Sequence, residues 1–511
     1  MLFNSLDFLI FFPTVVALHF LLPHRWRWLM LLVASCWFYM AFVPAYIVIL
    51  ALTIVIDYVA GLWIENAQGK RRKWLLIVSL ISNVGILAFF KYLGFFAENA
   101  AALFHWLNLP YAAAVVTAGA NRVFVTVLGL FGQSGVSSYT EAMSILPIGL
   151  SFHTFQAMSY TIEVYRGNQR AERHFGIYAL YVMFFPQLVA GPIERPQNVL
   201  HQFHERKTFD AARALDGLRW IYWGMFKKMV VADRLSQFVD PVFNGPNPEK
   251  YGALATAGAT VAFAIQIYCD FSGYSDVAIG TAKVMGYKLM ENFRRPYLAT
   301  NIQAFWARWH ISLSTWFRDY VYIPLGGNRV SRARRYFNVA VVFLVSGFWH
   351  GAAWTYLVWG GLHTVFNLGT MALREAGWLK LPERRWANAL GIAFTFLLVS
   401  FAWIFFRAHT IADALTLIRT LGTWRGWDVE WQSLDYWALR TGDPTPPFRV
   451  IFSGVALALL GLGDYLIEKK RDRLTLPQLQ TLRPLLYAAM VVFFLLFAVF
   501  DSGKQFIYFQ F

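Results

Sequence analysis

Long apolar segments alternate with short polar or basic loops along most of this 511-residue chain. A helix needs about 20 apolar residues to cross the hydrocarbon core of a bilayer, and many of these segments approach that length. They lie near residues 6–22, 28–43, 46–64, 74–97, 112–130, 146–164, 177–189, 218–231, 253–269, 337–349, 352–368, 389–406, 450–466 and 485–500. The pattern predicts an all-α, polytopic integral membrane protein with roughly 11 to 13 transmembrane helices.

The charges of the first loops predict an orientation. Residues 24–27 and 70–73 are basic, whereas residues 42–45 are neutral. Because cytoplasmic loops carry an excess of Lys and Arg, alternating crossings place both basic loops in the cytoplasm and the N-terminus outside. The N-terminus has no basic n-region, so we expect no cleaved signal peptide.

The regular pattern breaks between Asp270 and Ala333, where polar, aromatic and basic residues mix. Such a stretch forms either amphipathic surface helices or re-entrant segments that are buried in protein, and both alternatives stay open here. Residues 408–448, partly helical from 411 to 421, and residues 468–483 are the expected loops. The sequence has no internal repeat or second soluble domain, so we expect one transmembrane domain over residues 1–511.

The composition supports a membrane protein and excludes several functions. Hydrophobic residues make up 58% of the chain and charged residues 14%, whereas a soluble domain carries about a quarter charged residues. The net charge of +16 is explained by basic cytoplasmic loops and requires no nucleic acid. Cys36 and Cys269 lie in apolar segments and predict neither a disulfide framework nor a metal site. The motifs of serine hydrolases and zinc proteases are missing.

The strongest candidate for chemistry is His350, which stands between two apolar segments. An ionisable side chain at membrane depth is costly unless it is hydrogen-bonded or lines a wet cavity, so it indicates a functional site by default. The neighbouring Gly347 and Gly351 leave room for a ligand or another helix. A neutral imidazole in this place can accept a proton from an attacking hydroxyl. The alternative is a core histidine bonded to a nearby carbonyl.

A second histidine, His310, lies inside the broken region. Helical spacing places Ser314 and Arg318 near its face, and the alternative is an aromatic belt around a hydrogen-bonded histidine. Asp270 and Asp276 follow an apolar segment. They either line a polar cavity or cap the next helix, and we favour capping for Asp270.

The broken region is also strongly basic, with Arg294, Arg295, Arg308, Arg318 and several arginines between 329 and 335. One explanation is ordinary cytoplasmic loop charge. The other is a dock for the phosphates of a donor such as coenzyme A, because guanidinium groups match phosphate oxygens.

Several motifs, specific when taken together, resemble the membrane-bound O-acyltransferase family, most closely its bacterial branch of alginate O-acetyltransferases and teichoic-acid D-alanyl transfer proteins. The motifs lie at residues 146–152, 185–193, 292–297, 308–316, 319–327, 347–352 and 506–511. His350 matches the signature histidine of the family, and His310 matches its second polar position. The resemblance implies tilted helices around a central tunnel, with these two residues near a constriction. We add as candidate donor-binding or tunnel residues Arg308, Ser314, Arg318, Asp276 and Trp349, and we expect no metal.

The resemblance also implies acyl transfer from a cytosolic thioester, acetyl-CoA or another, with no bound cofactor, in a bacterial inner membrane. A separate periplasmic acetyltransferase-type protein would then acylate an exopolysaccharide. Alginate is the favoured polymer, and cellulose, peptidoglycan and teichoic acid are alternatives. The aromatic C-terminus, residues 506–511, would either contact that partner or anchor the chain at the interface.

Two functions of other classes stay open. A transporter or flippase of a lipid-linked sugar would use Asp270, Asp276 and the histidines as a proton relay. A non-catalytic scaffold of a polysaccharide synthase would need none of these side chains.

Overall fold

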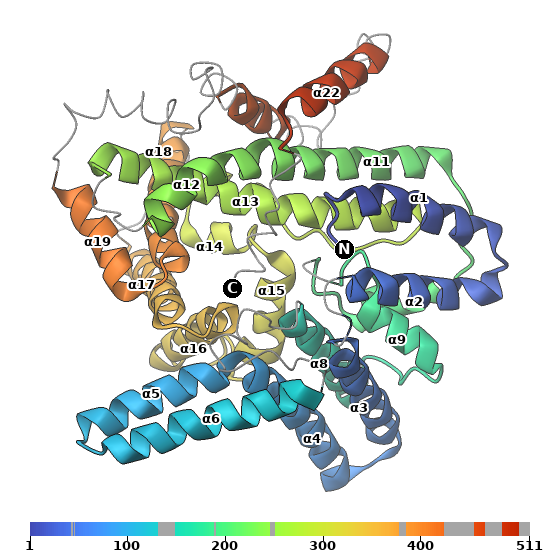
Figure 1. Ribbon diagram of the computed structural model, residues 1–511, viewed down its shortest axis with the longest axis horizontal. Coiled ribbons are helices and arrows are strands. Elements are labelled where there is room, and N and C mark those ends of the chain that lie inside the picture. Colours follow the sequence, from blue (N-terminus) through green and yellow to red (C-terminus); the bar gives the residue numbers. More distant parts are fainter. Residues whose placement is uncertain are drawn as a thin grey trace. The chain divides into compact units, whose positions relative to one another are not determined.

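The computed structural model describes residues 1–41, 44, 46–130, 149–188, 191–245, 251–377, 385–423, 454–464 and 483–499. This part of the chain contains helices and no strand (Figure 1), which confirms the all-α prediction. The contacts divide the chain into two compact units. The first consists of Met1–Arg219, Ala278–Met290 and Trp349–Ala353, and the second of Trp220–Val277, Glu291–Phe348 and Trp354–Phe511. The single domain over residues 1–511 stays a prediction.

Within the described residues, five helical segments are long and apolar enough to cross a membrane. They are Tyr46–Asn66, Gly69–Trp106, Pro110–Gly129, Ala253–Val284 and Arg385–Arg407. The chain is therefore a multi-pass membrane protein by composition and length. Fewer segments meet this criterion than the 11 to 13 predicted, partly because α1 and α2 have only 16 and 17 residues.

The first unit contains most of the N-terminal helices. They are α1 (Leu6–Leu21), α2 (His24–Met40), α3 (Tyr46–Asn66), α4 (Gly69–Leu87), the π-helix η1 (Ala88–Tyr92), α5 (Leu93–Trp106), α6 (Pro110–Leu130), α8 (Leu150–Arg166), α9 (Phe175–Met183), α10 (Pro196–Val199), η2 (Leu200–Phe203) and the start of α11 (Ala211–Met225). Figure 1 shows α5 and α6 side by side as a hairpin. Asn108 adopts a left-handed φ of 57° in its turn, which asparagine tolerates better than most residues.

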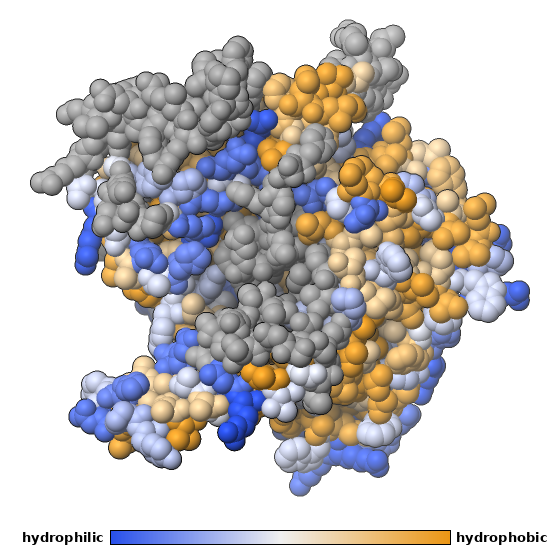
Figure 2. All heavy atoms as spheres, viewed as in Figure 1, coloured by the Kyte–Doolittle hydropathy of each residue, from blue (hydrophilic) through white to orange (hydrophobic). Residues whose placement is uncertain are grey.

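Apolar side chains cover the outer faces of α3 and α4. Leu52, Trp63, Trp74 and Ile81 are all more than half exposed. Figure 2 shows mostly orange side chains in the region of α3 and α4, with hydrophilic residues at its lower edge. Water would disfavour so large an apolar patch, whereas lipid tails accommodate it.

The apolar segment 177–189 does not form the predicted membrane crossing. The helix α9 has nine residues, or about 14 Å at the rise of an α-helix, too short for the hydrocarbon core. The chain leaves the helix at Phe184, whose ψ is 110°, two residues before Pro186. Residues Gly176 to Met183 are all buried, so this segment is a core helix of the first unit.

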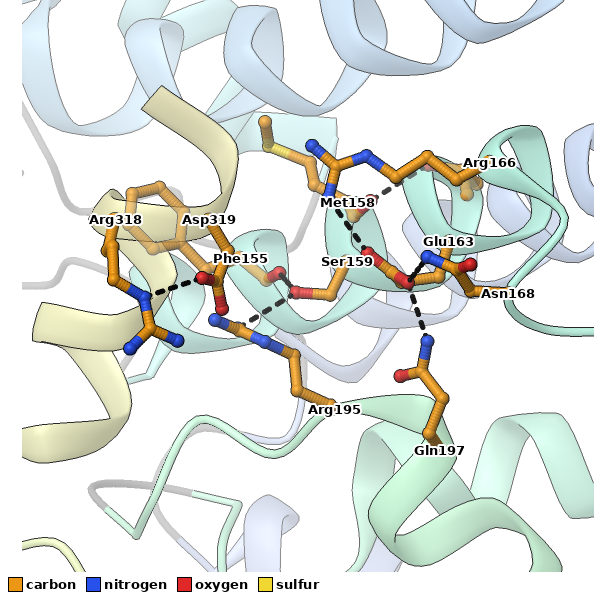
Figure 3. Close-up of polar contacts among 11 residues, drawn as sticks. Phe155, Met158, Ser159, Glu163, Arg166, Asn168, Arg195, Gln197, Arg318 and Asp319 are labelled. Atoms are coloured by element: carbon orange, nitrogen blue, oxygen red, sulfur yellow. Dashed lines mark hydrogen bonds and ion pairs between the residues drawn. The ribbon is translucent and has the colours of Figure 1, made fainter. Parts of the chain in front are cut away.

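Polar side chains that follow α8 and α9 form hydrogen bonds with residues of α8 (Figure 3). The Glu163 carboxylate accepts hydrogen bonds from Arg166 at 3.1 Å, Asn168 at 2.9 Å and Gln197 at 2.6 Å. Arg195 donates to the Ser159 hydroxyl at 3.5 Å. One carboxylate thus ties three separate polar side chains together.

A pH effect on stability is expected from Glu194, a fully buried residue between α9 and α10. Burial raises the pKa of this carboxyl from 4.5 to about 7, against hydrogen bonds from the Met290 amide and Asn198. Because the folded state keeps a proton that the unfolded state has lost, this residue's contribution to stability falls as the pH rises from about 4.5 to about 7. Glu194→Gln should therefore gain in melting temperature relative to wild type between pH 5 and pH 8 in detergent. A pH-independent difference would contradict this assignment.

The second unit holds the rest of the described chain. Its elements are the end of α11, the π-helix η3 (Phe226–Ala232), α12 (Asp233–Asn244), most of α13 (Ala253–Val284), η5 (Pro296–Leu298), α14 (Ile302–Trp306), α15 (Ile311–Phe317), the π-helix η6 (Arg318–Tyr322), most of α16 (Arg332–His350), α17 (Trp354–Glu375), α18 (Arg385–Arg407), α19 (Ile411–Gly422), a helix at 454–464 and α22 (Arg483–Phe497). The predicted helix at 411–421 is confirmed. It begins with a capping box between Thr410 and Asp413, which satisfies two free N–H groups.

The middle of the broken region, residues 299–309, contributes side chains to the interior of the second unit. Ile302, Phe305 and Trp309 belong to the same buried cluster as Trp359 and Trp403. These short helices therefore fit the second predicted alternative, segments that are buried in protein, better than the first, amphipathic surface helices. Their polar backbone ends can be tolerated at membrane depth for that reason.

Glycines let α16 and α17 approach closely. A Cβ atom on Gly347 would collide with the Tyr356 carbonyl, and one on Gly360 with the Phe343 carbonyl. Small residues at both crossing points are typical of helices that pack tightly in membranes. The predicted close approach at Gly347 is confirmed, and its partner is another helix.

Candidate active site

His350 is the last residue of α16, and it belongs to the first unit together with Trp349. Only 6% of His350 is exposed. A helix leaves its last four carbonyls without partners inside the helix, so the position of this histidine depends on what binds those carbonyls.

A lysine from η1 binds them. The Lys91 Nζ donates to the Trp349 carbonyl at 2.8 Å and to the His350 carbonyl at 2.9 Å. The Tyr92 hydroxyl also contacts the Trp349 carbonyl at 3.5 Å. A cation at the C-terminus of a helix is favoured by the helix dipole, so Lys91 is both a cap and a counter-charge for the helix end that carries His350.

Aromatic rings hold the adjacent Trp349 in place. Its ring stacks on Phe155 with centroids 5.1 Å apart and meets the edge of Phe152 at 5.7 Å, both on α8. The His350 ring is perpendicular to the Trp349 ring at 5.0 Å. Trp349, predicted as a tunnel or donor-binding residue, is 3% exposed and packs against the candidate base.

His310 belongs to the second unit and stands directly before α15. Its backbone is left-handed, with φ 44° and ψ 55°. This conformation is strained for a residue other than glycine and occurs mostly where the surroundings enforce it. The helical face that was predicted for His310 and Ser314 is therefore wrong at its first residue, since the helix begins at Ile311.

The side chain that holds His310 is Asn292. Its Oδ1 lies 3.2 Å from His310 Nδ1 and accepts from the Ser312 hydroxyl at 2.9 Å. Its Nδ2 donates to Ser275 on α13 at 3.2 Å. The edge of Phe271 contacts the imidazole at 4.7 Å, so the ring sits in a mixed polar and aromatic pocket.

The predicted roles of the two aspartates change. Asp270 does not cap a helix, because it lies within α13 and forms an ion pair with Lys228. Lys228 also pairs with Asp233 at 2.9 Å. Asp276 pairs with Lys227, which donates to Ser272 at 3.0 Å. Both aspartates are thus paired with buried lysines of η3, and neither is a helix cap.

Ser314, Arg308 and Arg318 are placed differently from one another. The Ser314 hydroxyl donates to the Trp309 carbonyl at 3.1 Å, which gives it a structural role. Arg308 is half-buried, and its carbonyl accepts from the Arg294 amide. Arg318 is exposed and donates to Asp319 at 2.8 Å (Figure 3). The exposed Arg332 and the partly exposed Arg335 both pair with Glu375.

Sequence reasoning missed Lys91, Asn292 and the lysines of η3. Lys91 carried a usable signal, because it is a lone charge within the apolar segment 74–97, and such residues are functional candidates by default. Asn292 carried only its place in a recognised motif. Lys91 and the two lysines lie in π-helices, which occur often at functional sites.

The family match and the most similar relatives agree on the class of protein. Residues 125–408 match the membrane-bound O-acyltransferase family. The chain is 35% identical over 470 residues to a probable alginate O-acetylase of Pseudomonas aeruginosa, covering 91% of this chain and 82% of the relative. It is 34% identical over 431 residues to a peptidoglycan O-acetyltransferase of Helicobacter pylori, covering 78% and 73%. A teichoic acid D-alanyltransferase of Streptococcus thermophilus is 31% identical over 306 residues, covering 55% and 74%.

Together, the helical membrane fold and these similarities define a multi-pass membrane O-acyltransferase. The chain belongs to the membrane-bound O-acyltransferase family, as its motifs predicted.

Proposed function

We propose that this protein transfers acetyl groups from cytosolic acetyl-CoA across a bacterial inner membrane for O-acetylation of an exopolysaccharide. The observation that carries the proposal is His350, a buried histidine at a helix end capped by a lysine. Alginate is the favoured polymer because of the similarity to alginate O-acetylases. Peptidoglycan, teichoic acid and cellulose are the alternatives, the first two also carried by the names of relatives.

In this proposal, His350 acts as the general base. Its neutral imidazole takes the proton of an acceptor hydroxyl, whose oxygen attacks the thioester carbonyl carbon. The carbon–sulfur bond then breaks, and the leaving thiolate receives the proton from the imidazolium. His310 orients the donor or shares the proton. Exclusion of water protects the thioester from hydrolysis.

Asp276, Arg308 and Arg318 are the proposed donor-side residues. Asp276 is neutralised by Lys227, and Arg318 by Asp319. Arginine side chains still match phosphate oxygens better than lysine does, so Arg308, which is half-buried, is the better candidate for contact with the coenzyme.

The last step of the proposal involves a second protein, as the resemblance to the family implies. We propose that the acetyl group passes to a hydroxyl of a periplasmic acetyltransferase-type partner, which then acylates the polymer. The C-terminal residues 506–511, a predicted contact of that partner, lie outside the described residues.

The test is reconstitution of the protein in sealed vesicles with radiolabelled acetyl-CoA on the cytosolic side. Alginate, cellulose or peptidoglycan is supplied on the other side, first alone and then with candidate periplasmic proteins. We expect label on a periplasmic protein, and label on polymer only when that protein is present. Efficient polymer labelling by this chain alone would exclude the partner step. Label on peptidoglycan or cellulose in preference to alginate would change the acceptor.

A further inference from the structure

We infer that Asn292 is a positioning residue for the reaction, because it fixes the orientation of the His310 imidazole and the ring nitrogen that carries the proton. This inference rests on the proposed function in one respect, namely that His310 takes part in acyl transfer. It adds a second residue to that site and specifies the reactive atom as Nε2.

The orientation of the Asn292 amide follows from a backbone contact. The Ser312 amide donates to Asn292 Oδ1 at 3.2 Å, and a backbone N–H can only donate. The opposite edge agrees, because Nδ2 faces the Ser275 hydroxyl at 3.2 Å. The oxygen of the amide is therefore the atom that faces His310.

That orientation determines the tautomer of His310. Asn292 Oδ1 can only accept a hydrogen bond, and it lies 3.2 Å from His310 Nδ1. The Ser312 hydroxyl, 3.4 Å from the same nitrogen, directs its hydrogen to Asn292 Oδ1 at 2.9 Å, so His310 Nδ1 carries a hydrogen of its own. In a neutral imidazole the other nitrogen, Nε2, then holds the lone pair. A base whose tautomer is fixed by a third group is the arrangement that general-base histidines require.

The backbone reinforces this geometry from both sides. The Ile311 amide donates to the Asn292 carbonyl at 2.8 Å, and the Arg294 amide donates to the Arg308 carbonyl at 2.8 Å. Residues 292–294 and 308–311 are thereby tied together around the left-handed His310. The side chain of Asn292 is fully buried, so water does not compete for its oxygen.

The chain offers a matched control for loss of a buried asparagine. Asn338 is also fully buried in the second unit. Its amide donates to the Leu325 and Gly327 carbonyls at 3.2 Å and 3.3 Å. Replacing Asn338 removes comparable structural bonds without touching either candidate histidine.

The test compares Asn292→Ala, Asn292→Asp, His310→Ala, the double variant Asn292→Ala/His310→Ala, and Asn338→Ala in the reconstituted reaction. Release of coenzyme A thiol from acetyl-CoA gives kcat and KM, and melting temperatures report folding. We expect Asn292→Ala to lower kcat by about 100-fold or more, with KM changed little. Asn292→Asp keeps the acceptor oxygen, so it should retain most of kcat and move the acidic limb of the kcat profile to higher pH.

The double variant separates positioning from folding. If Asn292 acts through His310, the double variant should be no slower than His310→Ala alone. The inference would be overturned if the losses of kcat in Asn292→Ala and His310→Ala add up in the double variant. It would also be overturned if Asn338→Ala loses as much kcat at a similar melting temperature. Neither result would contradict the proposed role of His310. A His310→Ala variant with nearly wild-type kcat would overturn both the inference and the proposed role of His310.

Discussion

Replacing His350 by glutamine is expected to lower the rate of acetyl transfer by at least about 100-fold, which is the lower end of what a general base contributes. Glutamine keeps a similar volume and hydrogen-bonding capacity but has no nitrogen that titrates near neutral pH. The protein should still insert and accumulate, because the cap on the His350 carbonyl is a backbone contact with Lys91. The measurement is transfer from labelled acetyl-CoA by equal amounts of purified protein.

His153 provides the control for this experiment. It is also buried, at 2% exposure, and its Nε2 lies 2.7 Å from the Leu188 carbonyl. His153→Gln can keep that contact through its amide N–H, so we expect transfer close to the wild-type rate. If His350→Gln retains wild-type transfer, or if His153→Gln loses as much, the role of His350 as base is wrong.

Burial alone does not distinguish a candidate catalytic histidine from a core histidine. His19, His153 and His363 are as buried as His310 and His350. The His363 Nδ1 accepts from Trp306 at 3.3 Å, as a core histidine would. Hydropathy alone could not separate these residues. Trp349-His350-Gly351 and its recognised motif favour His350, because they carry information about chemistry that a burial pattern lacks.

Local sequence patterns predicted elements well where each helix is stabilised by its own residues. The helix α19 begins at its capping box, and α6 begins at a proline, both as local rules require. The helix α9 was predicted too long, since a buried core helix and a membrane span have the same apolar composition.

Long-range ion pairs were beyond sequence reasoning. The sequence pattern broke at Asp270 because charged residues usually end a span. In the structure α13 continues to Val284, since Lys228 neutralises Asp270 from 42 residues away. Lys91 could be noticed as a lone charge, but its partners could not, because the carbonyls it binds are 258 and 259 residues further along the chain.

Replacing Lys91 by methionine is expected to lower both stability and turnover. Methionine fills a similar volume but leaves the Trp349 and His350 carbonyls without their ammonium partner. Hydrogen bonds to a charged group contribute about 1.5–3 kcal/mol each, so the melting temperature should fall clearly. The end of α16 would also lose the group that holds it, and a misplacement of about 1 Å at a reacting group can cost about 100-fold in rate.

The neighbouring residue Tyr92 tests whether the effect comes from the ammonium. Tyr92→Phe removes the long 3.5 Å contact with the same Trp349 carbonyl and keeps the ring, so turnover and melting temperature should stay near wild type. For Lys91→Met, kcat should fall at a temperature well below its melting point, with KM for acetyl-CoA changed little. Lys91 contacts His350 through the backbone carbonyl of that residue. If the melting temperature falls and kcat does not change, the role of Lys91 is structural.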